Sequence, residues 1–184
     1  MFTAQKGYQV DGLDLNETFL EIAKSKHQAG RFFHGDMEDF HLSNRYDAIT
    51  CLFSSIGYVR TLDGVGRTLA SFRNHLAVGG IIVIEPWFPP GVLDPSRVTT
   101  DTAEAAGVRV SRVSRVEEEG TISRVFFDYD ILDGSGSRHV SEVHELGLFT
   151  SEELLCAFER AALDVVFDPK GLTDRGLYVA RARA

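Results

Sequence analysis

Cysteine and clustered basic residues are both scarce in this chain. Only two cysteines occur in 184 residues, Cys51 and Cys156, and each lies in an apolar run. Two cysteines are too few for a disulfide scaffold, so the sequence predicts two buried thiols in a reducing compartment. No block of Lys and Arg is present, and the formal net charge is −8. This balance argues against a nucleic-acid partner, which needs a concentrated positive surface.

Long apolar runs are also missing. No segment has the roughly 20 consecutive apolar residues that a membrane-spanning helix requires, and no signal-peptide pattern is present. The sequence therefore predicts a cytoplasmic protein with no membrane partner. With 43% hydrophobic and 25% charged residues, the composition is that of an ordinary globular domain large enough to bury a core.

A glycine-rich phosphate loop is the third absence. Val10–Leu15 is an apolar run that contains Asp14 near its end and is followed by a helical pattern. Doubly wound α/β folds place a ribose-binding carboxylate at such a position, with the glycine-rich loop about 20 residues upstream. Only nine residues precede Val10, and Gly64–Gly66 is no substitute because it follows no strand. We therefore expect the fold to lack its first strand, which leaves an apolar sheet edge open to aggregation or pairing.

Strands and helices alternate through the first half of the chain. Apolar residues recur at helical spacing in two segments, and short β-branched runs separate them. This alternation predicts an α/β architecture with right-handed crossovers. The predicted elements are a strand at 10–15, a helix at 17–26 with Asn16 as N-cap, strands at 31–34 and 46–52, a helix with the apolar stripe Val65, Leu69, Phe72 and Leu76, a turn at 77–80 and a strand at 81–85.

The pattern changes beyond Pro86. A loop rich in proline and glycine leads into alternating runs that predict antiparallel strands at 108–116, 122–132 and 138–149. This insertion leaves from the carboxyl end of a parallel strand, the ligand-binding edge of open α/β sheets, so we expect it to cover the cleft and select the substrate. A helix at 151–162 and strands at 163–168 and 176–181 follow. The expected parts are a cofactor-binding part at 1–91, the insertion at 92–149 as substrate cover or dimer contact, and a C-terminal part at 150–184 that completes the sheet.

The order of these pieces resembles the class I S-adenosylmethionine-dependent methyltransferases. The resemblance rests on Gly35–Met37, on the runs YDAITCLFSSIGYV and HLAVGGIIVIEPWF, and on Asp174–Leu177. Within this family, the sequence most resembles the N,N-dimethyltransferases that act on TDP-linked amino sugars in macrolide antibiotic pathways. The resemblance implies a Rossmann-like fold without its first strand, an antiparallel β insertion after the fifth strand of the family pattern, S-adenosylmethionine as cofactor, and N-methylation of a TDP-linked amino sugar.

The resemblance also implies a set of cofactor contacts. Asp14 would accept hydrogen bonds from both ribose hydroxyls, a task suited to an ionised carboxylate. Asp36 would bind the adenine amino group, while a backbone N–H near Met37 meets a ring nitrogen. Phe53 would lie near the cofactor, where an aromatic face tolerates a sulfonium charge. The expected contacts are Asp14, Leu15, Asp36, Met37, Leu52 and Phe53.

Tyr58 matches the family position that orients the attacking amine or takes its proton. Methyl transfer to a neutral amine is a direct displacement, so alignment and desolvation supply most of the acceleration. Ser54 and Ser55 are either donors to the substrate or turn residues. Arg175 either binds a diphosphate through two N–H groups of its guanidinium or forms a surface ion pair with Asp174 or Asp168. The expected substrate contacts are Ser54, Ser55, Glu85, Trp87, His144 and Arg175.

Other interpretations stay open. Glu142 and His144 share a strand face while His139 points away, so no metal site is expected. The chain could methylate oxygen or nitrogen in another small metabolite, or be a non-catalytic remnant that forms a homodimer through its insertion. A nicotinamide-dependent dehydrogenase is disfavoured by Gly35–Met37 and by the insertion. Because the glycine-rich loop is absent, we expect this chain to bind S-adenosylmethionine weakly or not at all.

Overall fold

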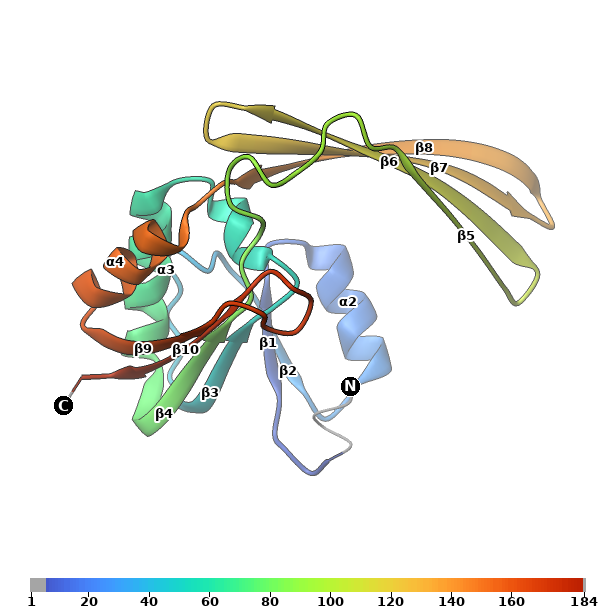
Figure 1. Cartoon of the computed structure of the whole chain (residues 1–184). Helices are drawn as coiled ribbons and strands as arrows, with labels where there is room; N and C mark the ends of the chain where they lie inside the picture. The colour runs from blue at the N-terminus through green and yellow to red at the C-terminus, as the bar shows by residue number, and fades with distance from the viewer. Residues whose placement is uncertain (1–5, 184) are drawn as a thin grey trace.

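The chain folds into three β-sheets and the helices that flank them (Figure 1). A computed structural model describes residues 6–183. Its elements are β1 (Asp11–Asp14), α2 (Glu17–Lys26), β2 (Arg31–His34), β3 (Tyr46–Cys51), the 3-10 helix η1 (Ser55–Val59), α3 (Leu62–Asn74), β4 (Leu76–Ile84), β5 (Thr99–Ala105), β6 (Val108–Glu119), β7 (Ile122–Asp133), β8 (Gly136–Gly147), α4 (Ser151–Arg160), β9 (Leu163–Asp168) and β10 (Leu177–Ala182).

The parallel strands are divided between two sheets. β1 and β2 form a parallel pair, and the larger sheet has the order β3-β4-β10-β9 with β3 and β4 parallel and β10 antiparallel to its neighbours. Among residues 6–183 no strand joins β1 to β3; instead the Tyr46 hydroxyl donates to the Asp11 carboxylate at 2.9 Å. The α/β fold is confirmed, whereas the division of its parallel strands between two sheets was not predicted from the sequence.

The helices begin at residues that satisfy their free N–H groups. The Asn16 side chain accepts from the N–H of Phe19 and begins α2, as predicted. Thr150 begins α4 with a reciprocal pair of bonds to Glu153, a capping box. α3 and α4 lie side by side on one face of the larger sheet, whereas α2 lies beside β1 and β2 (Figure 1).

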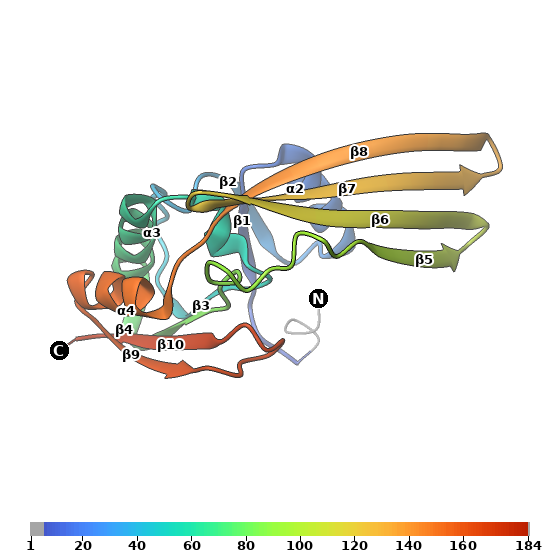
Figure 2. The ribbon, with the colours of Figure 1, turned by 45° about the horizontal axis from the view of Figure 1, so that its top comes forward.

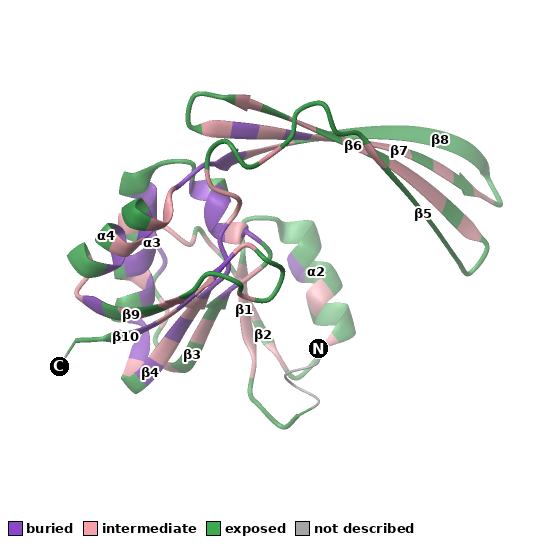
Figure 3. Ribbon diagram, viewed as in Figure 1, coloured by how far each residue is buried: buried purple, intermediate pink, exposed green. Residues whose placement is uncertain are grey.

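The core lies between the larger sheet and helices α3 and α4 (Figure 3). Ile82 of β4 and Leu69 of α3 are fully buried, and such aliphatic side chains contribute about 1.5–3 kcal/mol each. Tyr178 stacks on Phe158 and Phe167, with ring centroids 5.4 and 4.6 Å away. Helix α2 contributes little to this core: its predicted apolar residues Phe19 and Ile22 are exposed, and only Leu20 is buried.

Strand β4 begins earlier than predicted. The expected turn at 77–80 is part of the strand, and Leu76 pairs with Tyr46 rather than continuing α3. Gly79 has a φ of 78°, which permits a bulge at the register shift. Gly80 runs so close to β3 that a Cβ would lie 2.8 Å from the carbonyl oxygen of Tyr46. The glycines therefore serve the pairing of two strands and make no turn.

The insertion is a four-stranded antiparallel sheet, β5-β6-β7-β8, which extends away from the rest of the molecule (Figures 1 and 2). Three of its strands were predicted: β6 and β7 extend beyond their predicted ends, and β8 begins and ends two residues before its predicted bounds. β5 was missed because Thr99–Ala105 is almost wholly polar and shows no apolar alternation.

The two cysteines differ in burial. Cys51 is buried, and burial raises the pKa of its thiol to about 12. Cys156 is exposed on α4, so the prediction of two buried thiols is wrong for this residue. No helix among residues 6–183 is long and apolar enough to cross a membrane.

Candidate functional site

The predicted site residues follow the ends of the four parallel strands. β1 ends at Asp14, and Asp36 follows β2 by two residues. Leu52–Tyr58 follow β3, and Glu85 follows β4. The carboxyl ends of paired parallel strands meet at one edge, and both edges face the insertion sheet (Figure 1).

Two carboxylates at this edge have unused acceptor capacity. One oxygen of Asp14 accepts from the N–H of Asn16 at 2.8 Å, and one oxygen of Asp36 accepts from the N–H of Glu38 at 2.9 Å. Within residues 6–183 the second oxygen of each has no partner. The N–H of Gly35 donates to the carbonyl of Asp14 at 3.1 Å, which holds the two loops together.

This acceptor pair fits adenosine, whose ribose hydroxyls and exocyclic amino group are donors. The three apolar residues predicted beside the cofactor differ in exposure. Leu15 is exposed, Leu52 is half-buried, and Met37 is half-buried against the core. All of these residues lie on the side of the site where the sequence predicts the adenosine half of S-adenosylmethionine.

Phe53 lies in a strained turn, and its side chain is exposed to solvent. Its side chain is 79% exposed, and Phe53 and Ser54 have φ angles of 53° and 64°. Consecutive left-handed residues with side chains are costly and persist only where neighbours hold them. Here the N–H of Phe53 donates to the Glu85 carboxylate at 2.8 Å, which fixes the turn.

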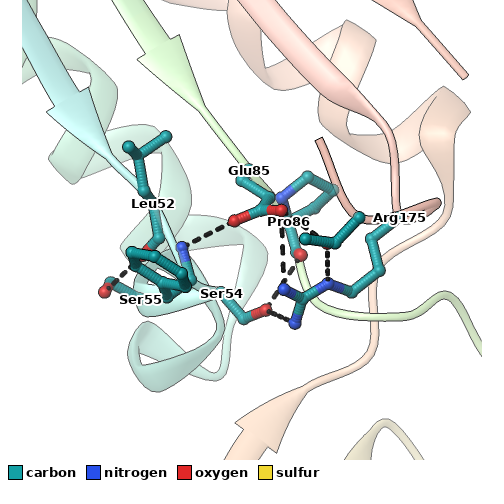
Figure 4. A network of polar contacts seen from close by, with 8 residues as sticks. Leu52, Ser54, Ser55, Glu85, Pro86 and Arg175 are labelled. Carbon is teal, nitrogen blue, oxygen red and sulfur yellow. Dashed lines mark hydrogen bonds and ion pairs between the residues drawn. The ribbon is translucent and has the colours of Figure 1, made fainter. Parts of the chain in front are cut away.

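Glu85 is the centre of a buried polar network (Figure 4). Its side chain is 1% exposed, and its second oxygen accepts from the Thr173 hydroxyl at 2.6 Å and pairs with Arg175 at 3.4 Å. Burial alone would raise the pKa of Glu85, but bonds from Thr173 and Phe53 and the charge of Arg175 outweigh it and lower the pKa. Both carboxylate oxygens have protein partners, so the Glu85 side chain is part of the buried structure of the site and is not open to a ligand.

Arg175 joins the C-terminal loop to this network. Its Nε donates to the Thr173 hydroxyl at 2.8 Å and its Nη1 to the Ser54 hydroxyl at 2.6 Å. The guanidinium lies 5.8 Å from the ring centroid of Trp87. Its ion-pair partner is Glu85, so the predicted alternative of a surface pair with Asp174 or Asp168 is wrong. Of five N–H donors, two have no protein partner in the described chain.

The two serines have different surroundings. The Ser54 hydroxyl is buried and donates to the carbonyl of Pro86 at 3.0 Å while it accepts from Arg175. The Ser55 hydroxyl donates to the carbonyl of Leu52 at 2.8 Å and acts as a turn residue (Figure 4). Trp87 lies against the insertion, where its indole N–H donates to the Ser123 hydroxyl at 2.7 Å.

Tyr58 and His144 meet where the insertion crosses η1. The Tyr58 hydroxyl lies 2.7 Å from Nδ1 of His144, and Nε2 of His144 lies 3.3 Å from the Glu142 carboxylate. Burial of the phenol raises the pKa of Tyr58, and the charge of Glu142 raises it further.

One residue of the site, Thr173, was missed in the sequence, which holds no signal for it. Among residues 6–183, no group of three or more His, Cys, Asp and Glu side chains could hold a metal ion.

Comparison with known proteins identifies the family. A family described as "Methyltransferase domain" matches residues 1–80. A Streptomyces venezuelae dTDP-3-amino-3,4,6-trideoxy-alpha-D-glucopyranose N,N-dimethyltransferase is 37% identical over 179 residues, which cover 97% of this chain and 75% of that protein.

Solved structures agree with this assignment. The crystal structure of Streptomyces venezuelae DesVI has a TM-score of 0.90 at 36% identity, over 94% of this chain and 74% of that one. CalS10 with bound S-adenosylmethionine, an amino pentose methyltransferase from Micromonospora echinaspora, has a TM-score of 0.83 at 35% identity, over 94% and 73%. The chain therefore belongs to the S-adenosylmethionine-dependent methyltransferases, close to the dTDP-amino-sugar N,N-dimethyltransferases.

Proposed function

We propose that this chain methylates the amino nitrogen of a TDP-linked amino sugar. The observation that carries the proposal is that two kinds of group follow the carboxyl ends of the parallel strands. These are the acceptors suited to adenosine and the exposed Phe53, near Arg175 and Trp87. The relatives add support, since the Streptomyces venezuelae relative is named for a dTDP-amino sugar and CalS10 for an amino pentose.

Cofactor binding is assigned to the ends of β1, β2 and β3. The free oxygens of Asp14 and Asp36 would accept from the ribose hydroxyls and the adenine amino group. Leu15, Met37 and Leu52 would provide apolar contacts, and the exposed ring of Phe53 would face the sulfonium. When bound, the cofactor supplies a methyl group made electrophilic by the positive sulfur.

Substrate binding is assigned to the wall formed by Trp87 and Arg175. The two unpartnered N–H groups of Arg175 would donate to a diphosphate oxygen, while its bonds to Thr173 and Ser54 fix the guanidinium. Glu85 would act by holding Arg175 and the turn at Phe53 rather than by touching the substrate. Tyr58 would contact the attacking amine.

A methyl-transfer assay tests this proposal. With labelled S-adenosylmethionine in large excess, to offset the weak cofactor binding that the sequence predicts, we expect transfer to a TDP-linked amino sugar and none to a phenolic acceptor. Asp14→Asn should weaken cofactor binding by about tenfold or more, because a charge-assisted bond to the ribose is lost. Asp47→Asn is the matched control, since Asp47 is an exposed carboxylate near the start of β3, at the opposite end of the strand from the site.

Two results would contradict the proposal. Transfer to the phenolic acceptor alone would indicate an O-methyltransferase. Equal cofactor affinity for Asp14→Asn and Asp47→Asn would remove Asp14 from the site.

A further inference from the structure

A chain of hydrogen bonds leads from the site into the insertion sheet. It starts at the hydroxyl of Tyr58 on η1, passes through Nδ1 and Nε2 of His144 on β8, and ends at the carboxylate of Glu142. Tyr58 and His144 are 86 residues apart, so this contact exists only because the insertion packs on η1.

We propose that Tyr58, His144 and Glu142 form a proton relay that removes the proton released when the substrate amine is methylated. His144 is the accepting base, Tyr58 conducts the proton to it, and Glu142 positions the imidazole. The inference rests on the proposed function and adds to it the route by which the nitrogen becomes neutral again.

The contact with Glu142 selects one tautomer of His144. An ionised carboxylate can only accept, so the neutral ring carries its proton on Nε2, and the unprotonated Nδ1 accepts from the Tyr58 phenol at 2.7 Å. Glu142 lies 3.3 Å from Nε2 and accepts that proton. The ring of Phe127 contacts the imidazole edge-on, with centroids 5.3 Å apart, and limits its rotation. The imidazole is therefore held with a lone pair aimed at Tyr58.

The proton balance follows from the reaction. The amine nitrogen forms a bond to the methyl carbon, and the electron pair of the broken carbon–sulfur bond remains on sulfur. The nitrogen now carries one proton too many, and this proton passes to the oxygen of Tyr58 as the phenolic proton passes to Nδ1 of His144. The imidazolium pairs with Glu142, which is half-exposed and open to water.

A second methylation of the same nitrogen makes this step necessary. An alkylammonium such as that of lysine has a pKa of about 10.4, so near neutral pH the methylated nitrogen keeps its proton and has no free lone pair. A base must take that proton before the nitrogen can attack again.

Tyr58 is suited to conduct a proton rather than to hold a negative charge. Burial and the charge of Glu142 both raise the pKa of its phenol, so it stays protonated near neutral pH. The other charged groups around His144 are Arg112 on β6, whose guanidinium lies over Phe127, and Arg60 after η1, which pairs with Glu145. The Glu142 carboxylate forms an ion pair with Nε2 of His144 when the imidazole is protonated.

Nitrogen NMR of the full chain tests the relay without any need for activity. In the wild-type protein we expect the Nε2-protonated tautomer of His144, and in Glu142→Gln a shift toward a mixture of tautomers. His139→Gln is the control, because His139 lies on the same strand but on its other face and should leave the His144 signals unchanged. A wild-type His144 protonated on Nδ1 overturns the relay, whatever the activity of the protein.

Kinetics provide the second test. His144→Gln should lower kcat for transfer to the monomethylated amino sugar by about tenfold or more with little change in KM, and should remove one limb of the pH–rate profile. His139→Gln, the same substitution on the same strand, should match wild type, and thermal unfolding should show both variants folded. A His144→Gln profile identical to wild type overturns the relay. If wild type methylates no amino sugar, the proposed function fails while the tautomer measurement still decides the relay.

Discussion

At the scale of single residues, Glu85 links two separate segments of the site. It joins the turn after β3, through Phe53, to the loop between β9 and β10, through Thr173 and Arg175. The resemblance placed Glu85 among the expected substrate contacts, but nothing in the sequence pairs it with Arg175, 90 positions away. That pairing depends on β10 lying beside β4.

We predict that Glu85→Gln destabilises the protein by about 3 kcal/mol, because it leaves Arg175 without its buried counter-ion. Urea unfolding followed by the fluorescence of Trp87, the only tryptophan, would measure this change. Glu104→Gln removes an exposed ion pair with Arg109 and should cost no more than about 1 kcal/mol. Equal losses in the two variants would contradict the account of the network.

The stability of Glu85→Gln should also depend less on pH than the stability of the wild type. The pKa of Glu85 is lowered in the folded state, so its stabilisation is present above the unfolded value of 4.5 and is lost as the pH falls through the folded pKa. Wild type should therefore lose more stability than Glu85→Gln between neutral pH and acid.

At the scale of elements, the sequence predicted a helix or strand correctly where residues within that segment determine its structure. The predicted bounds of α2 agree with Glu17–Lys26 because Asn16 supplies a cap at its start. β5 escaped prediction because a polar edge strand is held by pairing with β6 and not by an apolar face. Phe19 and Ile22 gave α2 an apolar stripe, but no described element covers it.

The capping box of α4 gives a test at this scale. Thr150→Ala should destabilise the protein by about 1 kcal/mol, because the N–H of Glu153 loses its acceptor and the Glu153 side chain loses the Thr150 hydroxyl. Thr121→Ala, in the exposed turn before β7, should change the unfolding free energy by less than about 0.5 kcal/mol. Differential scanning calorimetry of the two variants would measure both, and an unchanged Thr150→Ala would show that α4 is held by packing alone.

At the scale of the whole molecule, the insertion sheet extends beyond the body (Figure 2). We propose that it also forms a homodimer contact. Val113 and Val143 are exposed on the face turned away from the body, and β5 and β8 are open edges among the described strands. Apolar side chains beside unpaired strand edges favour association with a second chain.

Light scattering coupled to size exclusion would test the dimer. We expect the mass of two chains for wild type and a shift toward monomer for Val143→Asp, which places a charge in the contact. Val166→Asp is the control, because Val166 is 73% exposed on β9, outside the insertion. A monomer mass for wild type at every concentration would rule out the contact.

The sequence by itself determined the α/β class, the residues at the strand ends and the resemblance to methyltransferases. These depend on features that are local in the chain: apolar periodicity, caps, and acidic residues after short strands. The tertiary structure decided the rest. His144 contacts Tyr58, 86 residues away, only because β8 packs on η1. The buried Glu85 pairs with Arg175, 90 residues away, only because β10 pairs with β4.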